Sequence, residues 1–87
     1  MATVVVPHLM RDLTGGLARV EAPGHTVRAV IDALEERYPG FRSRLCEDDA
    51  LSAVLTIAVD GKVSRLGLMQ PVGQSSEIRF LPVIEGG

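Results

Sequence analysis

Eighty-seven residues suffice for one domain with a single core, and 46% of them are hydrophobic with two Phe, one Tyr and no Trp, which predicts an aliphatic core. The formal net charge is −2 and the basic residues are scattered, which argues against a nucleic-acid-binding protein. The sequence shows neither a membrane-spanning stretch nor a secretory signal, and its single cysteine, Cys46, cannot form an internal disulfide. We therefore expect a cytoplasmic protein without membrane partners.

The first 22 residues are predicted to form a β-hairpin. Residues 3–8 are rich in β-branched side chains and alternate as a strand does, with Val5 on the face opposite Val4 and Val6. Residues 9–16 are expected to be a connection, because they end in two glycines that permit a tight return. Residues 17–22 alternate again and form the returning strand.

An amphipathic helix is predicted to follow, with Thr26 as its N-cap. Apolar residues recur at helical spacing from Val27 to Tyr38, and Pro39-Gly40 ends the helix. Beyond it, Phe41 and Leu45 are expected to reach the core from a short helical turn. The acidic residues 47–49 are expected to form a solvated loop.

The second half of the chain contains the remaining strands. Residues 53–60 alternate as a half-buried strand, and Asp60-Gly61 is a strong signal for a hairpin turn into a short strand at residues 63–65. Residues 66–75 contain two glycines and a proline, so they are expected to be irregular. Residues 77–83 form the last strand, in which Ile78 and Phe80 point inward and Leu81 points outward.

The predicted strands form one sheet, and one amphipathic helix is available to cover a face of it. This combination predicts a two-layer α+β domain. The first and last strands carry the most large apolar side chains, so we place them at the centre of the sheet, adjacent and parallel, with the helix crossing over. This arrangement is the β-grasp (ubiquitin-like) fold, with a mixed sheet of four to five strands and one main helix on one face. We assign residues 1–83 to the domain and residues 84–87 to a flexible C-terminal Gly-Gly tail.

Residues suited to conventional catalysis or metal binding are few. His8 and His25 stand alone, without the spacing of a metal site. Cys46 follows an apolar residue near a predicted helix end, which favours a small half-buried filler over a nucleophile. The glycines at 15 and 16 do not belong to a phosphate-binding loop, because the pattern GxxxxGK[ST] is absent.

The sequence ends in Ile84-Glu85-Gly86-Gly87, directly after strand-like residues. Glycine lacks a Cβ, so Gly86 and Gly87 can thread a slot too narrow for other residues. Four extended residues reach about 13 Å. A frayed terminus is the plain alternative. The short distance from the last strand favours a reactive carboxylate on Gly87 that is presented to another protein, with Ile84, Glu85 and Gly86 threading its channel.

Taken together, these features resemble the ThiS/MoaD family of ubiquitin-like sulfur carriers over the whole chain. The β-grasp order, the Asp60-Gly61 turn, the closing strand and the terminal glycines carry the resemblance. It is strongest to the CysO-type branch, which serves cysteine biosynthesis, and the matching segments are Val6-Pro7, residues 13–16, residues 34–40 and residues 81–83. Two departures are residues 73–77, where such carriers usually have an acidic turn, and Glu85, where a small residue is commoner.

The resemblance implies a carrier, not an enzyme, that binds no cofactor itself. An E1-like adenylyltransferase/sulfurtransferase would adenylate the Gly87 carboxylate with ATP, and a sulfur donor would convert it to a thiocarboxylate. A downstream enzyme, such as a PLP-dependent cysteine synthase, would accept the sulfur. Val5, Leu81 and Val83 are the expected docking surface, because the strand alternation turns Val5 and Leu81 away from the helix.

Other functions fit the same tail. The chain could be the small subunit of a molybdopterin synthase, with the tail inserted in a large catalytic subunit. A ubiquitin-like modifier would instead join its terminal carboxylate to lysines of other proteins. A β-grasp interaction module without tail chemistry is the plainest interpretation.

Overall fold

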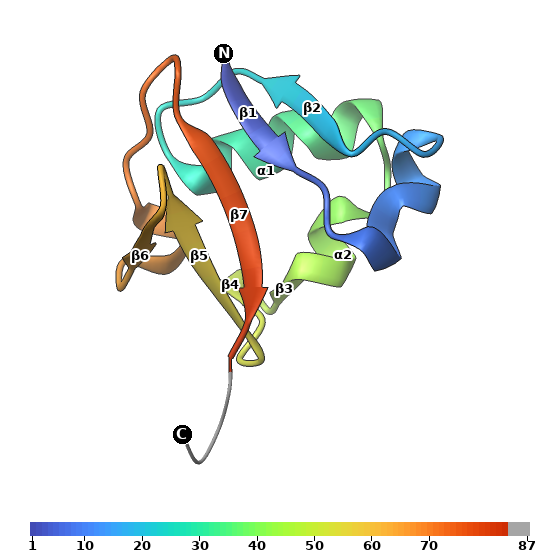
Figure 1. The fold of residues 1–87 in the computed structure, drawn as a ribbon. Helices are drawn as coiled ribbons and strands as arrows, with labels where there is room; N and C mark the ends of the chain where they lie inside the picture. Colours follow the sequence, from blue (N-terminus) through green and yellow to red (C-terminus); the bar gives the residue numbers. More distant parts are fainter. Residues whose placement is uncertain (84–87) are drawn as a thin grey trace.

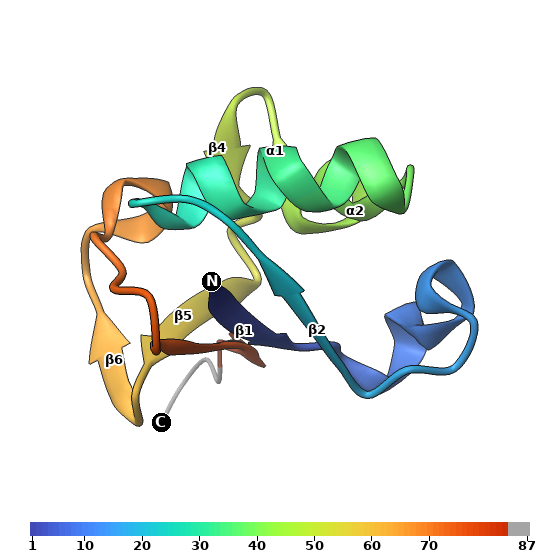
Figure 2. The same cartoon turned by 90° about the horizontal axis from the view of Figure 1, so that it is seen from above.

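The computed structural model describes residues 1–83 and shows a five-stranded mixed sheet with a helix lying across one of its faces (Figures 1 and 2). The sheet contains β1 (Ala2–Val5), β2 (Arg19–Ala22), β5 (Leu55–Val59), β6 (Lys62–Ser64) and β7 (Glu77–Pro82) in the order β2-β1-β7-β5-β6. The remaining elements are the 3-10 helices η1 (His8–Thr14) and η2 (Gly67–Met69), the helices α1 (Val27–Arg37) and α2 (Phe41–Leu45), and a small hairpin of β3 (Cys46–Glu47) and β4 (Ala50–Leu51).

The last strand, β7, occupies the centre of the sheet. It pairs with β1 in parallel, with Val4 opposite Ile78, and with β5 in the antiparallel sense, with Ile57 opposite Phe80. These four side chains are buried under α1. The predicted parallel pair of first and last strands, and with it the β-grasp fold, is therefore confirmed.

The main helix forms where the sequence places it. The Thr26 hydroxyl oxygen accepts a hydrogen bond from the Ala29 N–H at 3.2 Å, so Thr26 is the N-cap. The apolar face of α1, made by Val27, Val30, Ile31 and Leu34, is fully buried. The helix α2 follows and buries Phe41 and Leu45, as predicted, which closes one end of the core.

The N-terminal segment differs from the prediction. The first strand ends at Val5 instead of His8, and the expected connection is largely the 3-10 helix η1. Pro7 explains this difference, because a residue without an N–H cannot extend the strand pairing. The η1 helix buries Met10 and ends at Thr14, and its C-cap is Gly15, whose φ of 66° suits glycine.

The acidic segment is a hairpin turn, not a plain loop. Cys46–Glu47 pairs with Ala50–Leu51, and Asp48 and Asp49 form the turn with φ of 47° and 62°. Residues 47–49 are exposed, as expected. Strands of two residues carry no readable alternation, so the hydrophobic pattern could not indicate them.

The surface of β5 also departs from simple alternation. A half-buried strand was predicted here, and Ile57 is buried in the core, but Ala58 on the opposite face is buried as well. Ala58 lies between Arg79 on β7 and Val63 on β6, whose longer side chains flank it.

Among the described residues, none of the helices has the length and apolar character needed to cross a membrane.

Candidate functional site

The candidate site is the end of β7, where the chain leaves the sheet. The last strand pair is Leu55 with Pro82, and the Val83 N–H then donates to the Val54 carbonyl oxygen at 2.8 Å. Val83 is thus held directly beside the start of β5. The predicted reactive residue Gly87 and the predicted threading residues Ile84, Glu85 and Gly86 lie outside the described residues.

The predicted docking residues lie close together on the described surface. Because Ile78 and Phe80 face α1, Leu81 faces the opposite, outer side of the sheet, and Val5 shares that side. Val5 is half-buried, whereas Leu81 is 37% exposed and Val83 is 44% exposed. Val5 pairs with Arg79, two residues before Leu81, so Val5 and Leu81 are diagonal neighbours across β1 and β7.

A charged cluster on the same outer face was not predicted. Val5 is paired with Arg19 on β2 and with Arg79 on β7, so an arginine flanks it on each side. Glu77 bridges both arginines, from its Oε2 to Arg19 Nη1 at 2.6 Å and from its Oε1 to Arg79 Nε at 2.9 Å. These hydrogen bonds hold the pKa of Glu77 below its ordinary value, and the bond from Arg19 has the largest effect.

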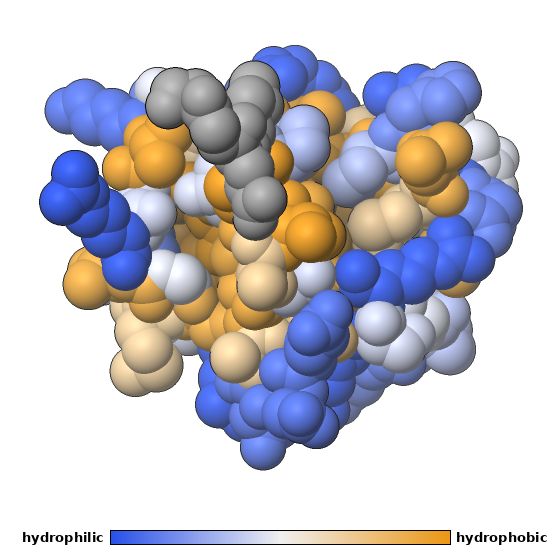
Figure 3. Space-filling model, turned by 90° about the horizontal axis from the view of Figure 1, so that it is seen from below, coloured by the Kyte–Doolittle hydropathy of each residue, from blue (hydrophilic) through white to orange (hydrophobic). Residues whose placement is uncertain are grey.

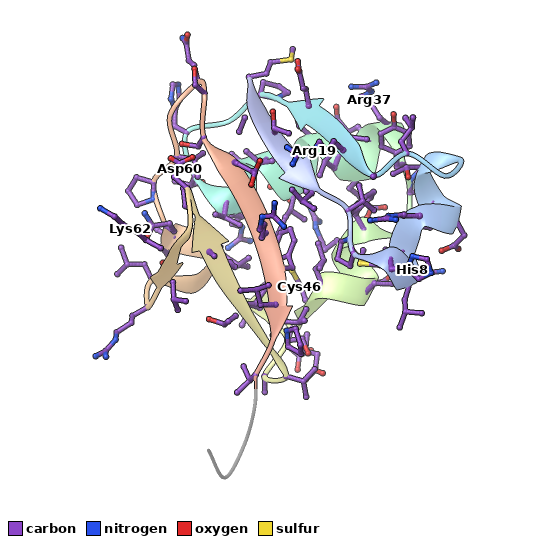
Figure 4. The ribbon with its side chains drawn as sticks, viewed as in Figure 1. His8, Arg19, Arg37, Cys46, Asp60 and Lys62 are labelled. Carbon is purple, nitrogen blue, oxygen red and sulfur yellow. The ribbon has the colours of Figure 1, made fainter. Side chains whose placement is uncertain are left out.

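This cluster changes the expected docking surface. The outer face is not a continuous aliphatic patch, because Arg19 and Arg79, both paired with Glu77, lie on the two sides of Val5. Arg19, the first residue of β2, is labelled in Figure 4 where β1 and β2 lie side by side. The sequence hides this cluster because its members come from β2 and β7, and only the strand register brings them together.

An apolar groove lies beside the end of β7 and was also not predicted. It has a volume of about 640 Å³ and lies between η1 and α2 on one side and the start of β5 and the end of β7 on the other. Figure 3, which looks at this end of the molecule, shows apolar surface gathered around the point where the described chain ends, with polar residues at the margins. The exposed apolar side chains of Leu9 and Val54 line this groove.

The residues weighed for conventional chemistry remain apart. His8 and His25 are exposed, and residues 1–83 contain no group of three or more potential metal ligands. Cys46 is half-buried, as the sequence indicates, and its burial raises the pKa of the thiol against a smaller opposing effect of Arg42. A protonated thiol is a poor nucleophile. His8 and Cys46 are labelled in Figure 4.

Comparison with known proteins places the chain in a family. The ThiS family model matches residues 4–87. Sulfur carrier protein CysO of Mycobacterium tuberculosis is 33% identical over 90 residues, which cover 98% of this chain and 97% of that protein. CysO in the crystal structure of the Amycolatopsis orientalis BexX/CysO complex is 34% identical, with a TM-score of 0.90 and full coverage of both chains. The crystal structure of Mycobacterium tuberculosis CysO is 31% identical, with a TM-score of 0.87 over 97% of this chain and 100% of that one. The chain therefore belongs to the ThiS family, and its similarity to CysO identifies it as a sulfur carrier of that type.

Proposed function

We propose that this chain carries sulfur as a thiocarboxylate on Gly87. An E1-like enzyme joins the Gly87 carboxylate to AMP from ATP and releases pyrophosphate. Sulfide then attacks the carbonyl carbon, a C–S bond forms, and the C–O bond to AMP breaks with its electron pair leaving on AMP. Activation is needed because a free carboxylate is a poor electrophile, and a covalent intermediate divides one difficult step into two easier ones.

The observation that supports this proposal most is the hydrogen bond from Val83 to Val54 at 2.8 Å. It holds the chain to the sheet at Val83, so four residues separate this point from the carboxylate of Gly87. Four residues reach about 13 Å when extended. The domain therefore controls where the carboxylate can go, and two terminal glycines keep the chain narrow enough for a recessed active site.

The proposed partners are two enzymes that act on the same carboxylate. The E1-like enzyme loads sulfur, and a PLP-dependent cysteine synthase is the proposed acceptor, with PLP bound to that enzyme. The CysO of Amycolatopsis orientalis is found in a complex with a second protein, BexX, which supports partner binding as a property of this type of carrier. We place the reaction in the cytoplasm because it consumes ATP.

Intact mass spectrometry tests the proposal. The chain is incubated with a candidate E1-like enzyme, ATP and sulfide, and loading raises its mass by the difference between one sulfur and one oxygen atom. A chain that ends at Glu85 is the matched control and is expected to gain no mass. Equal loading of this shortened chain would contradict the assignment to Gly87, and a stable adduct on lysines of other proteins would favour a modifier.

A further inference from the structure

We propose that the apolar groove beside the end of β7 is a docking site for the enzyme that activates Gly87. The occupant that we assign to it is an apolar side chain or short apolar loop next to the entrance of that enzyme's channel. The inference rests on the proposed function, because it names how the partner of the same carboxylate is held. It adds a contact surface to the outer sheet face, where Val5 and Leu81 lie.

The walls of the groove come from distant parts of the sequence. Phe80 and Leu55 contribute from the sheet, and Met10 from η1; Phe80 and Met10 are almost fully buried. Leu9 and Val54 stand at the rim and are 86% and 67% exposed. Exposed leucine and valine side chains on both sides of one hollow provide an apolar edge that an incoming side chain can cover.

The η1 wall is held in place before any partner binds. Arg44 on α2 donates two hydrogen bonds to the Asp12 carboxylate, at 2.8 and 2.9 Å, and a third to the Leu9 carbonyl oxygen at 3.2 Å. These bonds connect η1 to α2, and they pair the guanidinium of Arg44, which lines the groove, with a carboxylate. A wall that is fixed in advance and whose arginine is already paired favours an apolar occupant, because less order is lost on binding and no unpaired guanidinium is buried.

The length of the tail determines which surface a partner must touch. Gly87 lies four residues beyond Val83, so an enzyme that encloses its carboxylate must approach within about 13 Å of Val83. The groove is beside this point, because Val54 both lines it and holds the Val83 N–H. The network of Arg19, Glu77 and Arg79 makes part of the outer sheet face charged. The groove therefore supplies apolar contact surface in addition to the exposed side chains of Leu81 and Val83.

The test uses substitutions at exposed positions of the full-length chain. Leu9→Asp and Val54→Asp each place a charge at the groove rim. Leu66→Asp is the matched control, because Leu66 is also an exposed leucine, at 59%, next to a 3-10 helix: it is the N-cap of η2, and Leu9 is the second residue of η1. Leu9→Met keeps an apolar side chain at the rim. Affinity for the E1-like enzyme and thiocarboxylate yield are measured for each variant, and melting temperatures verify folding.

Both rim variants are expected to bind the enzyme at least about tenfold more weakly, as loss of an interface anchor does. Leu66→Asp and Leu9→Met are expected to stay within about twofold of the unsubstituted chain. Unchanged affinity in both rim variants would overturn the docking site. A weakening by Leu81→Asp alone would do the same and assign docking to the sheet face.

Failure of the proposed function has a different signature. The unsubstituted chain itself would then gain no sulfur, whatever the rim variants bind.

Self-association is followed by analytical ultracentrifugation. If Leu9→Asp abolished a dimer of the unsubstituted chain while its affinity for the enzyme stayed the same, the occupant would be a second copy and the proposal would be wrong.

Discussion

Leu34→Ala tests how far the packing of α1 on the sheet holds the domain together. Leu34 is fully buried on the face of α1 that contacts the core. The substitution removes about three methylene equivalents, at about 0.8 kcal/mol each, so the transfer cost is roughly 2.4 kcal/mol. The cavity left behind raises the expected loss to as much as about 5 kcal/mol. A domain of this size has a free energy of unfolding of roughly 4–13 kcal/mol, so much of it would disappear.

Urea denaturation followed by circular dichroism measures this loss. Leu9→Ala is the matched control, because it removes the same atoms from a side chain that is 86% exposed. It is expected to change the free energy of unfolding by less than about 0.5 kcal/mol. The slope of the free energy against urea should stay the same in both variants. Equal losses at the two positions would refute the assignment of the buried face.

Three further predictions concern single side chains. The N–H groups of Arg42 and then Gly40 hold the pKa of Glu35 below its ordinary 4.5. A carboxyl whose pKa is lower in the folded than in the unfolded state stabilises the fold at pH values above its unfolded-state pKa. This stabilisation is lost as the pH falls through the folded-state pKa. Glu35→Gln should therefore lower the melting temperature at pH 7 and converge with the unsubstituted chain in acid; a constant gap would contradict this. Cys46→Ser should retain full thiocarboxylate yield, because the thiol is half-buried and protonated, and lost yield in a folded variant would implicate the thiol. Gly86→Val should leave melting unchanged and prevent loading, since a β-branched side chain widens and stiffens the tail; normal loading would remove the narrow-channel argument.

The parts of the fold with strong periodic signals could be predicted from the sequence. The helix α1 has apolar residues at helical spacing and Thr26 as its N-cap. Both signals depend only on residues of that one segment, so they can be recognised in the sequence. The central place of β7 followed from its large apolar side chains together with those of β1. The candidate site was predicted at the end of this strand because the terminal glycines follow it closely in the sequence, and the role of Gly87 stays a prediction.

The surface around the site could not be predicted, because it depends on contacts between distant segments. Leu9 belongs to a segment without a strong pattern, and η1 becomes a groove wall because Arg44, 35 residues later, holds its backbone. The network of Arg19, Glu77 and Arg79 requires the register of β1 against both neighbours. Alternation tells which side of a strand a residue faces, but not which side chains on neighbouring strands will cover it.

The topology explains why a carrier of this kind needs a rigid domain behind so short a tail. The strand that leads to Val83 is the central one, and hydrogen bonds fix it on both sides, to β1 and to β5 (Figure 1). The position of Val83 is therefore set by the whole core. Under the proposed function, the core thereby limits where the Gly87 carboxylate can be presented. Core substitutions such as Leu34→Ala should reduce sulfur loading only through the fraction of molecules that is folded. Rim substitutions such as Leu9→Asp should reduce it at full folding, through the affinity for the enzyme. Plotting loading against the folded fraction separates the two cases, because core variants fall on one line and rim variants fall below it.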